Sequence, residues 1–273
     1  MLETSPSATP SPARRRWLRW VLLACAVVGV AAAVGAGAFV FWGSTPQPAT
    51  EVALSALRTG DGITVRLTSA GWTFAAQGSA EPTVGLALYP GGHVDPRAYA
   101  SLAREIATQG YLVVIPPMPL SFAFFDIDAA SRAIAASPGV RTWAVGGHSL
   151  GGTASTLFVT GHPGTVSGLV LLASYPPDGT DLTAATGPSG APLKAISIRG
   201  SRDGLVTARK IDASKKLLPS DATYVTIPGG NHAQFGMYGI QSGDGVPVIS
   251  VDAQTAETAA LVARFLGSLA PAH

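Results

Sequence analysis

The stretch Thr142-Trp143-Ala144-Val145-Gly146-Gly147-His148-Ser149-Leu150-Gly151-Gly152 decides the fold that we expect for this chain. The apolar run 142–146 predicts a buried strand, and residues 150–161 suit a helix. Glycine is common here, 32 of 273 residues, so a G-x-S-x-G pattern alone is a modest signal. Between a strand and a helix, however, it is typical of a sharp turn that exposes a serine hydroxyl. We therefore predict that Ser149 is a nucleophile.

Apolar runs and helix-compatible segments alternate on both sides of this stretch. We expect strands at 63–67, 72–76, 84–89, 111–115, 142–146, 168–174, 194–200 and 223–227. We expect helices at 95–109, 126–136, 150–161, 207–217 and 253–269. The first two strands predict an antiparallel pair, and the rest predict a three-layer α/β fold whose mostly parallel central sheet has helices on both faces. The Pro/Gly/Thr-rich segment 175–193 leaves room for only a minimal lid.

The amino-acid composition limits the classes of function that we expect for this chain. At 273 residues and 47% hydrophobic, the chain can bury a full-sized core. The formal net charge of +2 is local, because Arg14, Arg15, Arg16 and Arg19 stand against Glu3 alone. Residues 51–273 therefore hold 18 − 4 = 14 basic and 16 − 1 = 15 acidic side chains. A nearly neutral main part gives no electrostatic case for binding nucleic acid. The single cysteine, Cys25, excludes an intramolecular disulfide.

The N-terminal part predicts a membrane segment. Residues 21–42 are uncharged and would span about 33 Å as a helix, enough for a hydrocarbon core of roughly 30 Å. Tryptophans at 17, 20 and 42 mark its ends, and the preceding arginines favour a cytoplasmic N-terminus. We expect a disordered cytoplasmic segment (1–16), a transmembrane anchor or uncleaved signal (17–42), a linker (43–58) and a catalytic domain (59–273).

Two alternatives to an anchor place the catalytic domain on the same, extracytoplasmic side. The small residues Ala36-Gly37-Ala38 offer a cleavage site for export, although the apolar run is long for a cleaved signal. Residues 14–19 also resemble the twin-arginine export signal. The lipobox-like Leu22-Leu23-Ala24-Cys25 is rejected because the apolar run continues well past Cys25. A single-pass anchor in the cell membrane is favoured.

A serine nucleophile needs a base, and the base needs an orienting acid. On a fold of this kind the order along the chain is Ser, Asp or Glu, then His. His232 follows the strand expected at 223–227, whereas His162 lies at a helix end and His273 is terminal. Asp203 directly follows the strand expected at 194–200 and stands beside a glycine, with Asp178 as the fallback. We predict Ser149, Asp203 and His232 as a catalytic triad.

Two backbone amides should stabilise an oxyanion, and loops at the same sheet edge should bind substrate. One amide belongs to Leu150, after the nucleophile, and the other to Pro90-Gly91-Gly92-His93, where Gly92 is favoured over Gly91 and His93. Met118, Phe122, Tyr175 and Phe235 are the candidate substrate-binding residues, although aromatic residues in such loops are as often core.

These motifs together resemble the α/β-hydrolase superfamily, and more narrowly its small, lid-poor fold-5 group. The resemblance covers about residues 60–270. It rests on 89–96 with Tyr99, on 110–114 and 118–120, on 146–152, on 200–204 and on 229–239. The tail 238–245 is also typical of the group, but has no mechanism from sequence. The resemblance implies Ser149 as nucleophile, Asp203 as acid and His232 as base.

The function expected is hydrolysis of a carboxylic ester or related acyl bond through an acyl-enzyme. A small ester or acyl compound would be the substrate and the membrane a partner through the N-terminal helix. An acyltransferase or perhydrolase could use the same triad, and a non-catalytic binding module could use the same scaffold. No cofactor is expected, and no histidine or acidic spacing matches a metal-ligand pattern.

Overall fold

The computed structural model describes residues 12–78 and 82–270. Residues 1–11 of the segment predicted to be disordered, and His273, lie outside the described part. The chain divides into two compact units, Met1–Gly43 and Ser44–His273. The first unit holds helix α1 (Pro12–Gly43), which begins before the predicted start at Trp17. Its part Arg19–Gly43 is long and apolar enough to cross a membrane, a property that a signal sequence near an N-terminus shares.

The second unit is built on an eight-stranded sheet with the order β1-β2-β4-β3-β5-β6-β7-β8. Strands β1 (Ile63–Thr68) and β2 (Gly71–Ala76) form the expected antiparallel pair, and β2 is also antiparallel to β4. All other neighbours are parallel. The parallel strands are β3 (Val84–Tyr89), β4 (Leu112–Ile115), β5 (Thr142–His148), β6 (Gly168–Leu172), β7 (Lys194–Gly200) and β8 (Thr223–Ile227).

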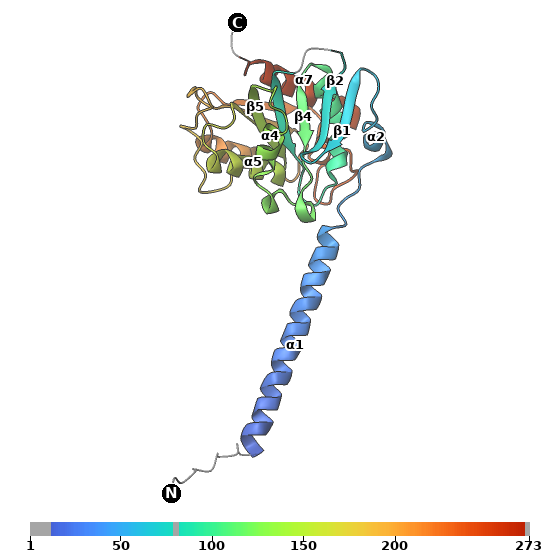
Figure 1. Cartoon of the computed structure of the whole chain (residues 1–273). Helices are drawn as coiled ribbons and strands as arrows, with labels where there is room; N and C mark the ends of the chain where they lie inside the picture. Colours follow the sequence, from blue (N-terminus) through green and yellow to red (C-terminus); the bar gives the residue numbers. More distant parts are fainter. Residues whose placement is uncertain (1–11, 79–81, 271–273) are drawn as a thin grey trace. The chain divides into compact units, whose positions relative to one another are not determined.

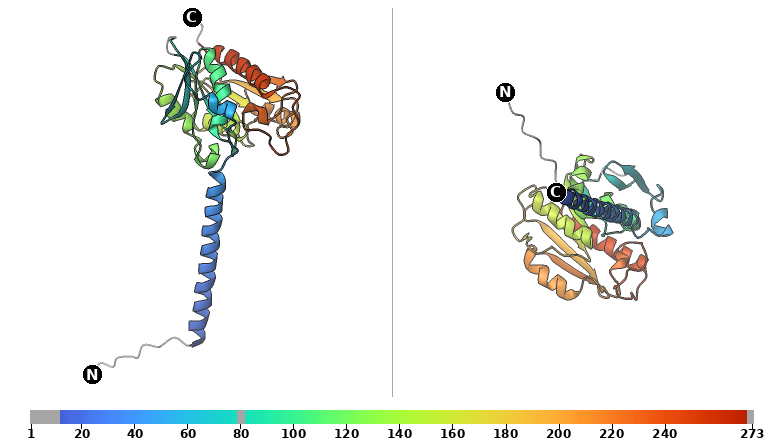
Figure 2. Two further views of the ribbon diagram at one scale, coloured as in Figure 1. Left: turned by 90° about the vertical axis from the view of Figure 1, so that its right-hand side faces the viewer. Right: turned by 90° about the horizontal axis from the view of Figure 1, so that it is seen from below.

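Alternating residues of the central strands face two separate cores, which makes the unit three-layered. Leu86 and Leu88 of β3 lie in one apolar cluster with α3 (Ala100–Thr108) and α7 (Val251–Gly267). Ala87 and Tyr89 lie in the other, with α4 (Ala129–Ala135) and α5 (Leu150–Gly161). The sheet lies between these two helical layers (Figure 1), and the turned views show the same arrangement (Figure 2). The predicted three-layer α/β fold with a mostly parallel sheet is confirmed.

Several element ends differ from the sequence prediction for local reasons. The helix expected at 95–109 is a 3-10 turn (Pro96–Tyr99) followed by α3, with Asp95 accepting a hydrogen bond from the Arg97 amide at 2.9 Å. The helix expected at 207–217 is α6 (Ala208–Ser214) followed by a 3-10 turn (Lys215–Leu217). Strand β6 ends at Leu172, because Ala173 has a left-handed backbone with φ of 45°. No helix or strand of the described chain lies between β6 and β7.

The segment before β1 is hydrogen bonded to the rest of the second unit. Gln47 donates from its amide to the carbonyl of His93 at 2.9 Å, and its own carbonyl accepts from Asp95 at 3.0 Å. The Thr50 amide donates to Met237, and the Thr50 hydroxyl caps helix α2 (Glu51–Ser55). The predicted linker 43–58 therefore contains a short helix and a bridge to the loop after β3.

The strand order reverses its direction beside β3. After β3 the chain turns outward to β4, and it then returns to the other side of β3 as β5. In open α/β sheets, ligands bind beyond the carboxyl ends of strands where the winding reverses in this way. The loop that begins at Pro90 and the turn at Ser149 both lie at this place, since they follow β3 and β5 directly.

Candidate active site

Ser149 has the strained backbone of a strand-to-helix turn. Its φ of 52° and ψ of −122° lie in a region that non-glycine residues rarely adopt. Its amide donates to Leu172 at 2.9 Å, and its carbonyl accepts from the Ser174 hydroxyl at 2.7 Å and from the amides of Gly152 and Thr153. These four hydrogen bonds hold the strain in place. Strain of this kind persists where the surroundings over-determine it, and such places cluster at functional sites.

The glycines around Ser149 are required for space. A Cβ on Gly147 would stand 2.7 Å from the Tyr89 carbonyl oxygen, and one on Gly151 would stand 2.3 Å from the Pro90 oxygen. A Cβ on Gly152 would stand 2.6 Å from Ser174 Cβ. Helix α5 therefore begins directly against the end of β3, which brings the Ser149 turn beside the Pro90 loop.

Asp203 and His232 form a buried hydrogen-bonded pair. Asp203 follows β7 and His232 follows β8, and these neighbouring parallel strands bring the two loops to one edge of the sheet. His232 Nδ1 donates to Asp203 Oδ2 at 3.0 Å, with side chains that are 1% and 0% exposed. Asp203 Oδ1 accepts from the amides of Leu205 and Val206 at 2.9 and 2.7 Å. The carboxylate is thus held by its own loop and turned to the imidazole.

The second nitrogen of His232, Nε2, is the atom of this pair that can accept a proton. With Nδ1 donating to the carboxylate, Nε2 is left with its lone pair, and it is buried without a hydrogen-bond partner. The imidazole lies 4.5 Å, between ring centroids, from that of His148, the residue before Ser149. A neutral imidazole so oriented can accept a proton through Nε2.

His148 and Tyr99 connect the loop after β3 to the His232 ring. The buried Tyr99 hydroxyl accepts from the Gly91 amide at 2.9 Å, so its own proton goes to His148 Nδ1 at 2.8 Å. Burial, and then the neighbouring His232, lower the pKa of His148 well below its usual range, more than a backbone contact with His232 raises it. His148 is therefore a neutral spacer between the Gly91 loop and the His232 ring.

The amides of the loop after β3 are not equivalent. Gly91 donates its amide proton to Tyr99, and His93 donates to the Ser121 carbonyl at 2.7 Å. The Gly92 amide has no acceptor among the described residues, nor has that of Leu150 at the start of α5. A Cβ on Gly92 would stand 2.6 Å from Leu150 Cδ1, so the two residues are adjacent. Two uncommitted N–H groups lie beside Ser149.

The four candidate substrate-binding residues have different surroundings. Phe122 lies against Gly92, since a Cβ there would stand 3.1 Å from its ring, and it stacks on His93. Tyr175 is half-buried, and its carbonyl accepts from the Thr153 hydroxyl. Met118 and Phe235 are buried in the two opposite core clusters. Phe235 packs behind His148, with 5.8 Å between ring centroids.

The other residues that the sequence offered as acid or base lie away from the Asp203–His232 pair. Asp178 is exposed in the loop after β6 and has no hydrogen bond to a histidine among the described residues. His162 pairs with Asp128 at 2.7 Å on the surface. No group of three or more His, Cys, Asp or Glu side chains that could hold a metal ion occurs in the described part of the chain.

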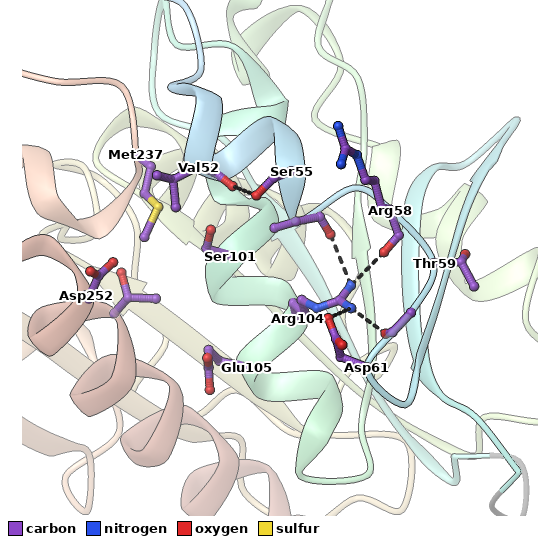
Figure 3. A pocket seen from close by; sticks show the side chains of 13 residues that line it. Val52, Ser55, Arg58, Thr59, Asp61, Ser101, Arg104, Glu105, Met237 and Asp252 are labelled. Carbon is purple, nitrogen blue, oxygen red and sulfur yellow. Dashed lines mark hydrogen bonds and ion pairs between the residues drawn. The ribbon is translucent and has the colours of Figure 1, made fainter.

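A cavity of about 600 Å³ lies away from these residues, between α2, α3 and α7. Figure 3 shows how its wall is tied by Arg104 of α3, whose guanidinium donates to the carbonyls of Ala56, Arg58 and Gly60. Because backbone carbonyls already occupy this guanidinium, Arg104 itself is not free to bind an anionic ligand. Arg104 instead fixes the chain between α2 and β1.

Comparison with known proteins identifies the family of this chain. A model of the alpha/beta hydrolase family matches residues 85–256. The chain belongs to the alpha/beta hydrolase family. The match includes the turn at Ser149, Asp203 and His232, and it begins one residue after the start of β3. No curated protein matches the chain.

Solved structures similar to this alpha/beta hydrolase include esterases. A thermophilic esterase from the Planctomycetes species Thermogutta terrifontis, with butyrate bound, is 15% identical, covered over 80% of this chain and 100% of that one, with a TM-score of 0.51. A protein from Thermoplasma acidophilum described as a predicted CIB-like hydrolase is 15% identical, with coverages of 74% and 100% and a TM-score of 0.54. Est1E from Butyrivibrio proteoclasticus is 13% identical, with coverages of 76% and 100% and a TM-score of 0.50. At these identities the likeness concerns the fold.

Sequence reasoning missed two supports of this site. Tyr99 entered the sequence analysis only through the family resemblance, although Asp95-Pro96 places it in the first turn after the Pro90 loop. Gln254 of α7 gave no signal at all. It is fully buried, and its amide bonds the Asn231 amide and carbonyl at 3.0 and 2.8 Å, which fixes the residue before His232.

Proposed function

We propose that this alpha/beta hydrolase cleaves a carboxylic ester through a triad of Ser149, His232 and Asp203. The observation that carries the proposal is the buried Asp203–His232 pair, whose unpartnered Nε2 belongs to the ring packed on His148, next to the strained Ser149. A base oriented by a carboxylate beside a serine at a sharp turn is the arrangement that activates a hydroxyl.

The steps follow from the hydrogen-bond pattern. His232 Nε2 takes the proton of the Ser149 hydroxyl as Oγ attacks the ester carbonyl carbon. The amides of Gly92 and Leu150 donate to the oxyanion, and the tetrahedral intermediate collapses as Nε2 gives its proton to the leaving alcohol. Water, deprotonated by Nε2, then attacks the acyl-enzyme, and the acid leaves as the proton returns to Ser149. Asp203 keeps the imidazole in the required tautomer throughout.

No hydrogen bond joins Ser149 to His232 in the structure, because Nε2 has no partner. Hydrogen bonds of this kind commonly tighten only when substrate is bound. Phe122, beside Gly92, and the half-buried Tyr175 are the candidate residues best placed to contact an acyl group.

Ser149→Ala tests the proposal. We expect hydrolysis of p-nitrophenyl butyrate to fall by about 10⁴-fold or more, with unchanged thermal unfolding. The matched control is Ser220→Ala, at an exposed serine far along the chain, which should keep wild-type turnover. A fluorophosphonate probe should label the wild type at Ser149 and leave the alanine variant unlabelled. Retained turnover in Ser149→Ala would sink the assignment.

The same probe separates an enzyme from a non-catalytic binding module, and an added acceptor separates hydrolysis from acyl transfer. A binding module on this scaffold would not react with a fluorophosphonate. Acyl transfer or perhydrolysis would give the same labelling, but adding an alcohol or peroxide as acceptor would divert the acyl group from water.

We further propose that α1 anchors the protein in the cell membrane with the hydrolase unit outside. The apolar length of Arg19–Gly43 and the arginines before it support this orientation. Membrane fractionation, followed by protease accessibility of the hydrolase unit on intact cells, tests it. Recovery of a shortened protein from the medium would instead indicate cleaved export.

A further inference from the structure

The candidate acid and base stand on two different loops, and their separation depends on what joins these loops. Asp203 lies in the loop after β7, and His232 in the loop after β8. The only side-chain bond between the two residues is the 3.0 Å contact of the pair itself. The two loops also bond each other directly, from the Arg202 amide to the Gly230 carbonyl and from the Gly229 amide to the Ser201 hydroxyl, both at 2.8 Å. These two bonds lie before Asp203 and before His232, so other contacts must hold the chain at and after the acid and the base.

Asp244 supplies such contacts from a third segment. Its Oδ1 accepts from the amides of Gly204 at 3.1 Å, His232 at 3.2 Å and Gly245 at 2.7 Å. Its Oδ2 accepts from the amide of Ala233 at 2.8 Å. Gly204 directly follows the candidate acid, and His232 is the candidate base. One carboxylate therefore bonds the backbone of both loops.

The backbone around Asp244 packs closely on the acid loop. A Cβ on Gly245 would stand 1.9 Å from the Arg202 carbonyl oxygen, and one on Gly204 would stand 2.6 Å from the Gly243 oxygen. Asn231 donates from Nδ2 to the Gly245 carbonyl at 2.9 Å, on the side of the base. The segment 243–245 is thus wedged between the residue before the acid and the residue before the base.

A carboxylate suits this position better than any other short side chain. It is acceptor-only, with about four lone-pair directions, and it meets four N–H donors here. Hydrogen bonds to an ionised acceptor are also stronger than neutral ones. An asparagine would keep one oxygen for three of these donors but would turn an NH₂ group toward the fourth.

We propose that Asp244 is a positioning residue that sets the separation of Asp203 and His232. The inference rests on the proposed function, because it assigns a role relative to that acid and base. It also assigns a structural role to the segment 238–245, for which the sequence alone offered none. A misplacement of about 1 Å in a catalytic group lowers turnover by roughly a hundredfold, so the expected effect is large.

The experiment compares Asp244→Asn and Asp244→Ala in the full-length protein. Active sites are counted by the final stoichiometry of fluorophosphonate labelling, and kcat is expressed per labelled site. We expect kcat per site to fall by about 3- to 10-fold for Asn and by about 10- to 100-fold for Ala, with KM within about 3-fold of wild type. The control is Asp181→Ala, at an exposed carboxylate that bonds only the amide and hydroxyl of Thr183. It should keep wild-type kcat per site.

The outcomes separate positioning from stability. If Asp244 acted only on folding, Ala would lower the number of labelled sites, and each remaining site would turn over at the wild-type rate. The inference is overturned if both Asp244 variants keep the wild-type kcat per labelled site, whether or not the number of labelled sites falls. If Ser149→Ala retains activity the proposed function itself fails, a result that the Asp244 variants cannot imitate.

Discussion

Nδ1 of His232 donates to Oδ2 of Asp203 across 3.0 Å, with both side chains excluded from solvent. The other oxygen of Asp203 is occupied by two backbone amides, so the carboxylate cannot rotate without losing three hydrogen bonds. This rigidity leaves Nε2 of His232 as the nitrogen with the free lone pair.

Asp203→Asn should disable the base while keeping the fold. The asparagine oxygen must take the position of Oδ1, because the amides of Leu205 and Val206 need an acceptor there. Its NH₂ group then faces His232 Nδ1 and stabilises the tautomer that carries its proton on Nε2. We expect kcat on p-nitrophenyl butyrate to fall by about 10³- to 10⁴-fold. Wild-type turnover would show that another residue orients the imidazole, and Asp178→Asn is the matched control.

Gly92→Ala should weaken oxyanion stabilisation. Its Cβ would meet Leu150 Cδ1 at 2.6 Å and the Phe122 ring at 3.1 Å, so the loop must shift and carry the free amide with it. We expect kcat to fall by about 10²-fold, within the range for losing one oxyanion donor. Steady-state kinetics on a short-chain ester measure this. Gly161→Ala, whose Cβ meets nothing within 4 Å, should be kinetically silent.

Tyr99→Phe should destabilise the fold. The change leaves the Gly91 amide and His148 Nδ1 without a partner in a buried place. An unsatisfied buried polar group costs about 1–3 kcal/mol, so a loss of about 2 kcal/mol or more is expected in urea unfolding. Tyr111→Phe is the control, since its hydroxyl makes no hydrogen bond among the described residues. Equal stability of the two variants would contradict the network.

Acid should destabilise the folded protein through His148. Because burial lowers the pKa of His148 in the folded state, only the unfolded chain takes up its proton as the pH falls below about 6.5. The stabilisation is fully present above that pH and is lost as pH falls, by up to about 1.4 kcal/mol per pH unit, until the folded-state pKa is reached. His148→Asn keeps an acceptor for Tyr99 but does not titrate. Urea unfolding at several pH values from 7.5 down to 5 should therefore show a shallower acid slope in this variant.

The fold was predictable because its signals are local. Buried parallel strands such as β3 and β5 read as continuous apolar runs, and the turn at Ser149 is marked by glycines within a few residues. The order of Ser149, Asp203 and His232 along the chain is enough to make them candidates from sequence. The preference for Gly92 stays a prediction, and of the three loop amides that of Gly92 is the one without an acceptor among the described residues.

The supports of the site were not predictable, because they join distant segments. Asp244 bonds Gly204 across forty residues, and Tyr99 bonds His148 across forty-nine. No periodicity or spacing reports a side chain that meets a backbone amide of another loop. Phe235 and Met118 illustrate the opposite problem. Their residue types suit both a substrate pocket and a core, and the coordinates bury both.

Gln47 has a practical consequence for preparing the enzyme without its apolar helix. Since this residue is hydrogen bonded to His93 and Asp95, the chain from about Ser44 onward belongs to the hydrolase and not to a dispensable tether. A secreted derivative that starts at Ser44 would keep the hydrogen bonds of Gln47 to the loop after β3, whereas one that starts at Glu51 would lose them. Signal-peptidase processing near Ala38 would leave these bonds intact, so anchored and released molecules would share the same contacts on this loop.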